Sequence, residues 1–188
     1  MSNERKEIWE NAVEVVIHFE GLRYGPHTID LLNLGKSLQG FAKILISAGY
    51  FASTGHDLRR YVNSPVKVTT SARLERGSID ISAEIYSILS GVTAAALYDL
   101  IKYLLFEKIL NKHEFFWWKN RKEPRLNVNE LEAMALRLSY AKEQALSPIG
   151  NSCETISIIV GDNMPLTFNM RSKEILLDKE KTNFRVEF

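Results

Sequence analysis

The first clear pattern in the chain is an alternation of apolar and mostly polar residues near its start. Val13, Val15, Ile17 and Phe19 occupy every second position there. Side chains of a strand point to opposite faces in turn, so this period of two predicts a half-buried β-strand over residues 13–20. The segment GLRYGPH, with two glycines and a proline, then ends the pattern.

The same alternation recurs on both sides of Gly77 and predicts a β-hairpin. Glycine tolerates the positive φ that a short connection between antiparallel strands requires. The positions that share the apolar side are Val66, Val68, Thr70, Ala72 and Leu74 before the turn, and Ile79, Ile81, Ala83 and Ile85 after it.

Three other segments carry apolar residues at intervals of three and four, which predicts helices over about 28–49, 86–112 and 129–146. In the first of them, Thr28 is the expected N-cap. Gly35 and Gly40 each cost roughly 1 kcal/mol of helix propensity relative to alanine. Their presence suggests that a neighbouring element approaches this helix closely.

The segment 86–112 is apolar on nearly every side. Its uncharged run ends at Asp99, and the fourteen residues from Ile85 to Tyr98 fall short of the roughly 20 that a membrane-spanning helix needs. The pattern therefore favours a helix buried in a soluble core or in a subunit interface, with a membrane span as the alternative. For the interface hypothesis, the expected contact residues are Leu97, Leu104 and Leu105.

Alternating residues return after the third helix, over 156–160 and 166–170, and EILLD and FRVEF are candidates for further short strands. The chain thus divides into an α+β domain, residues 1–150, and a β-rich tail, residues 151–188. The element order β-α-β-β-α-α predicts an antiparallel sheet with helices on one face. Its other face would carry the mixed charges of a solvated surface: Glu14, His18, Glu20, Lys67, Arg73, Asp80 and Glu84.

Composition narrows the class of protein without naming a function. The 188 residues are 45% hydrophobic and 25% charged with a formal net charge of +1, as in an ordinary globular protein with no overall attraction to nucleic acid or anionic lipid. Cys153 is the single cysteine, which excludes an intrachain disulfide and a cysteine-based zinc site. The amino-terminal residues lack the apolar core of a signal peptide, so a cytoplasmic protein is expected.

A few residues could carry chemistry. His56 and Asp57 could form an acid–base pair, although adjacent residues of this kind more often lie in a solvated loop. Cys153 could be a nucleophile, although a buried structural thiol is the commoner case. The four histidines are too far apart in sequence to chelate a metal on one element, and no cofactor motif is present. An enzyme with a dispersed site remains an alternative.

The segment KHEFFWWKNRKEPR, residues 112–125, combines aromatic and basic residues. Such a patch suits single-stranded nucleic acid, a membrane interface or a protein interface, and it also suits aromatic residues that merely close the core. The expected binding residues are Phe116, Trp117, Trp118, Lys119, Arg121 and Lys122.

Three segments together resemble an uncharacterised family of bacterial and phage α+β proteins. They are EGLRYGPHTIDLLNLGKSLQGFAKIL, RLERGSIDISAEI and SPIGNSCETISI. The resemblance covers the layout of most of the chain and implies that the tail is part of a small β-barrel, truncated here. It implies no activity and no functional residue.

These observations together predict a non-enzymatic binding protein that self-associates or contacts another protein. An apolar helix at 86–112 needs more cover than one small sheet supplies, and a second copy could supply it. The first alternative is a peripheral membrane or single-stranded nucleic-acid binder that uses residues 112–125. The second is the dispersed-site enzyme.

Overall fold

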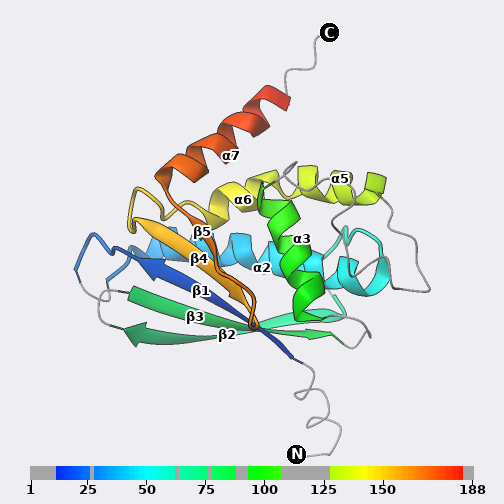
Figure 1. The fold of residues 1–188 in the computed structure, drawn as a ribbon, viewed down its shortest axis with the longest axis horizontal. Coiled ribbons are helices and arrows are strands. Elements are labelled where there is room, and N and C mark those ends of the chain that lie inside the picture. The colour runs from blue at the N-terminus through cyan, green and yellow to red at the C-terminus, as the bar shows by residue number, and fades with distance from the viewer. Residues whose placement is uncertain are drawn as a thin grey trace, which may run out of the picture.

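The computed structural model describes residues 12–25, 28–61, 64–75, 78–87, 93–106 and 128–183. Within them the chain forms an antiparallel sheet of five strands and five helices, which confirms the α+β class (Figure 1). In chain order the elements are β1 (Val13–Glu20), α2 (Leu31–Thr54), β2 (Val66–Glu75), β3 (Ser78–Ser87), α3 (Ala94–Phe106), α5 (Val128–Arg137), α6 (Ser139–Ala145), β4 (Thr155–Val160), β5 (Leu166–Phe168) and α7 (Met170–Asn183).

The first strand of the chain lies in the middle of the sheet, whose order is β2-β3-β1-β4-β5. Ile17 of β1 is paired with Ile81 of β3 on one side and with Ile158 of β4 on the other. All three isoleucines are buried. This row of apolar side chains shows how the period of two in each strand places one face of the sheet in the core.

Helices α2 and α3 pack on that apolar face of the sheet, and α6 packs on α2 (Figure 1). Val15, Phe19 and Ile85 point into the space between the two layers and are fully buried. On the opposite face Glu14 and Lys67 are exposed to solvent. The predicted arrangement, with helices on one face and a polar surface on the other, is therefore confirmed.

Helix α2 begins and ends later than its sequence pattern indicated. Asp30, not Thr28, is the N-cap, because its carboxylate accepts a hydrogen bond from the backbone N–H of Asn33 at 2.8 Å. Gly49 does not end the helix. Gly55 ends it, with a φ of 74° that favours glycine and an N–H that donates to the carbonyl of Phe51 at 2.8 Å.

The two glycines inside α2 have different surroundings. A Cβ atom at Gly40 would lie 2.4 Å from the carbonyl oxygen of Ala141 and 2.5 Å from the backbone nitrogen of Ala145, so α6 packs directly on the backbone of α2 there. At Gly35, in contrast, a Cβ would meet nothing within 4 Å. The predicted close approach is thus confirmed at Gly40 and wrong at Gly35.

Helix α3 occupies only part of the predicted apolar segment. It begins at Ala94 instead of residue 86, because Tyr86 and Ser87 still belong to β3. Leu97, Leu104 and Leu105 are completely buried in the core of the single chain. None of the helices in the described ranges is long and apolar enough to cross a membrane.

The third predicted helix is divided at Leu138 into α5 and α6. Its backbone hydrogen bonds continue across the division, since the N–H of Leu138 donates to Met134 at 3.0 Å and the N–H of Lys142 donates to Leu138 at 2.9 Å. The two segments therefore act as one slightly irregular helix that lies along α2.

The last part of the chain extends the central sheet and then becomes helical. Strand β4 pairs with β1, and β5 pairs with β4. The strand predicted for EILLD is wrong, because these residues lie within α7. The side chains of Asn169 and Ser172 each accept from the other's backbone N–H, at 3.0 and 2.7 Å, and this reciprocal cap starts the helix. Residues 184–188, with FRVEF, lie outside the described residues.

Candidate functional site

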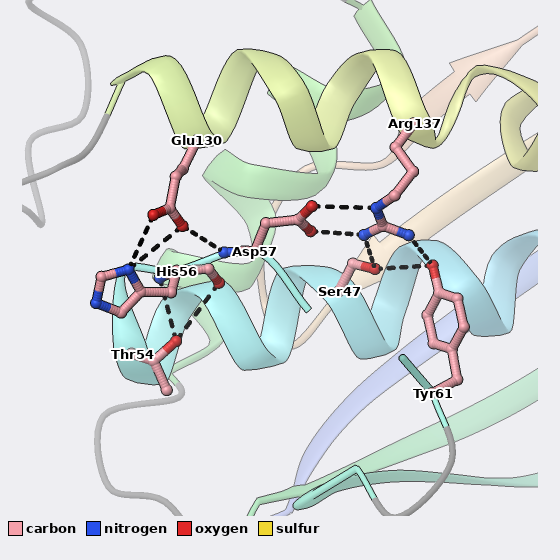
Figure 2. Close-up of polar contacts among 7 residues, drawn as sticks. All are labelled: Ser47, Thr54, His56, Asp57, Tyr61, Glu130 and Arg137. Carbon is pink, nitrogen blue, oxygen red and sulfur yellow. Dashed lines mark hydrogen bonds and ion pairs between the residues drawn. The ribbon is translucent and has the colours of Figure 1, made fainter. Parts of the chain in front are cut away.

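A network of polar side chains joins the loop after α2 to helix α5 (Figure 2). The left-handed turn at Gly55 takes the chain out of α2 and leads residues 56–61 along α5. The network joins one continuous stretch of chain to the distant helix α5: Ser47 and Thr54 of α2, His56, Asp57 and Tyr61 of the loop that follows it, and Glu130 and Arg137 of α5.

Arg137 is the centre of this network. Its Nε donates to Oδ2 of Asp57 at 3.1 Å and its Nη2 donates to Oδ1 at 2.6 Å, which makes a two-pronged ion pair. Its other contacts are to the hydroxyl oxygens of Tyr61, at 2.6 Å, and Ser47, at 3.3 Å. Burial lowers the pKa of Arg137, but the hydrogen bonds to Asp57 and Tyr61 outweigh burial and hold the pKa above its usual value.

Glu130 holds the same loop through His56 and through the backbone of Asp57. One of its carboxylate oxygens accepts the backbone N–H of Asp57 at 2.8 Å, and both oxygens lie 3.2–3.3 Å from Nδ1 of His56. The backbone hydrogen bond, followed by the contact with His56, lowers the pKa of Glu130. The carboxylate therefore favours its charged form, which is the form that accepts both contacts.

His56 and Asp57 do not face each other as an acid–base pair would. Although they are adjacent, each pairs with a different residue of α5: Asp57 with Arg137, and His56 with Glu130 (Figure 2). The carboxylate of Asp57 is only 12% exposed, and its two oxygens are taken by the guanidinium. The arrangement is suited to fastening a loop onto a helix.

Cys153 lies in the core and is fully buried. Burial raises the pKa of its thiol to about 12, against a smaller opposing effect of Lys173 and Arg23. The thiolate needed for nucleophilic attack is thus scarce at neutral pH. Lys173 is bonded elsewhere, since its Nζ donates to the carbonyl of Ile149 at 2.8 Å and so attaches α7 to the turn after α6.

The residues predicted for binding fall into two groups, one outside the described residues and one in the core. Phe116, Trp117, Trp118, Lys119, Arg121 and Lys122 lie outside the described residues. Leu97, Leu104 and Leu105 are core residues, so a role between copies would require α3 to leave the core. Within the described ranges, no group of three or more histidine, cysteine, aspartate or glutamate side chains could hold a metal ion.

A second polar pair lies on the open face of the sheet. Nδ1 of His18 in β1 contacts Oδ1 of Asp80 in β3, and the two residues are direct cross-strand partners. Ser157 of β4 is the partner of His18 on the other side, and its hydroxyl bonds to that of Thr167 at 2.8 Å. The sequence placed His18 and Asp80 on one face but could not show their register.

One end of the molecule exposes several apolar side chains around the turn 147–153. We call these the end patch: Tyr24, Leu31, Leu32 and Met170. Leu31 is 80% exposed and Leu32 is 74% exposed. The patch is brought together at Ser152, whose hydroxyl accepts from Asn33 at 3.0 Å and whose carbonyl accepts from Arg23 at 3.1 Å, and at Gly150, which lies against Met170.

A second candidate contact surface is the edge of the sheet formed by β2. Among the described residues this strand pairs with β3 alone, so its other side is free of a neighbouring strand. Lys67 and residues 69–72 are exposed. Val66 is buried against Gly49 of α2, where a Cβ would lie 3.0 Å from its Cγ1.

The antiparallel sheet and the helices packed on it and on each other define an α+β protein in which the described residues form one core. The chain belongs to a family described as a domain of unknown function (DUF7946), whose model matches residues 15–176. The match runs from β1 into α7, and it confirms the resemblance to a family without an assigned function. No curated protein and no solved structure matches the chain significantly.

Proposed function

We propose that this protein is a non-enzymatic interaction protein that self-associates. The observation that carries the proposal is the outer edge of β2, a strand of ten residues that pairs with no other strand than β3 among the described residues and is exposed over residues 69–72. An edge strand presents a row of backbone N–H and C=O groups that can pair with another strand. Proteins that remain monomeric usually shorten, charge or cover such an edge.

The opposite edge of the same sheet supports this interpretation. Strand β5 has three residues and leads at once into the capped start of α7, so it offers little backbone for pairing. In β2, the described side chains from Val66 to Ala72 include one charge, at Lys67, and no proline. Over residues 66–72 this edge therefore has few of the usual protective features.

Light scattering coupled to size-exclusion chromatography over a wide range of loading concentrations tests self-association. We expect a mass of twice 21.5 kDa at high concentration that falls toward 21.5 kDa on dilution. A constant mass of one chain up to millimolar concentration would contradict the proposal. Absorbance at 260 nm in the same experiment reports bound nucleic acid, which the first alternative predicts.

The end patch favours a second function, the binding of another protein. Leu31 and Leu32 lie in the first turn of α2, where their side chains are exposed and contribute little to the core. Burying two such leucines in a partner would contribute roughly 1.5–3 kcal/mol each. The partner expected by this chemistry is a protein that presents an apolar groove or face.

A photo-crosslinking side chain at position 32 tests the end patch in cells. We expect a discrete adduct there and none when the same group replaces Asp162, an exposed residue away from the patch. With the crosslinking side chain kept at position 32, Leu31→Glu should strongly reduce the adduct without loss of stability, since an acidic residue suits the first turn of a helix. An adduct of equal yield at both positions would show unselective contact.

The sequence also predicts three properties that separate experiments can test. A membrane or nucleic-acid contact through residues 112–125 awaits a pelleting assay with anionic vesicles and a salt series with single strands. A dispersed enzyme site awaits an activity screen. The cytoplasmic location rests on the single unpaired cysteine.

A further inference from the structure

We draw no further inference here: the strongest candidate, the pair of His18 and Asp80 on the open face of the sheet with Ser157 opposite His18 on β4, carries none, because the hydroxyl of Ser157 bonds to Thr167 instead of to His18 and nothing in the described part of the chain shows which molecule the pair would act on.

Discussion

Two contacts of opposite character join α2 to the helices that follow it. Near the middle of α2, Gly40 lets α6 approach its backbone, and Ser37 donates a hydrogen bond to the carbonyl of Ala145 at 2.6 Å in a fully buried position. Beyond its C-terminal end, Arg137 and Glu130 of α5 hold the loop through charged and partly exposed groups.

This difference predicts which substitutions and solution conditions should weaken each contact. The α2–α6 contact depends on the absence of a side chain, so it should be sensitive to added volume and indifferent to salt and pH. The loop–α5 contact depends on charge and on hydrogen-bond geometry, so it should respond to salt, to pH and to the shape of the cation.

The largest change in stability is expected from a side chain added at the contact between α2 and α6. Gly40→Ala should lower the free energy of unfolding by about 2–3 kcal/mol, because the new methyl group would overlap the backbone of α6. Gly35→Ala is its control: with open space around the position, it should stabilise the helix by roughly 0.5–1 kcal/mol. Urea denaturation measures both changes. Equal effects of the two substitutions would contradict the described packing.

Removal of the central cation should have the next largest effect. Arg137→Met leaves the carboxylate of Asp57, which is only 12% exposed, without its partner, and should cost about 1–2 kcal/mol at low salt. Arg137→Lys should recover little, because an ammonium group cannot make the two-pronged contact. The loss should shrink in about 1 M salt. An unfolding midpoint unchanged from the wild type would show that the ion pair contributes nothing.

The buried hydroxyl of Ser37 is expected to contribute less. Ser37→Ala removes one hydrogen bond to the last turn of α6 and should lower stability by about 1 kcal/mol. Unlike the change at Arg137, this loss should be the same at low and high salt. A salt-dependent loss would mean that the two contacts are coupled.

The smallest effect is a change in pH dependence at Glu130. Its folded pKa lies below the ordinary value of 4.5, so its stabilising contribution is complete above about that pH and is lost as the pH falls through the lower folded value. Glu130→Gln should therefore be less stable than the wild type near neutral pH, and the two should converge in acid. Glu132→Gln, an exposed neighbour, should run parallel to the wild type at every pH.

Much of the fold could be predicted because each strand and helix carries its own local pattern. The alternation over residues 13–20 gave β1 its correct bounds. The errors occur where local signals compete. In EILLD the apolar run resembles a strand, but the Asn169–Ser172 cap upstream starts a helix that continues through it.

The candidate sites could be predicted only in part, because they depend on contacts between distant segments. His56 and Asp57 stood out as neighbours, yet their partners lie on α5 and no spacing indicates Glu130 or Arg137. The leucines of α3 were expected in an interface between subunits, on a helix that would be buried either in the core or between copies, and they lie buried in the core. Only the packing of α2 and the sheet around them shows that the cover comes from the same chain.

The central position of β1 also has a consequence for the order in which the chain can fold. Val15 pairs with Ala83 on one side and with Val160 on the other. During synthesis the hairpin of β2 and β3 can join β1 early, but the second side of β1 stays open until β4 has emerged. Such distant pairings are slow to form. The late arrival of β4 therefore leaves β1 without its second neighbour until the helices between the two strands have been synthesised.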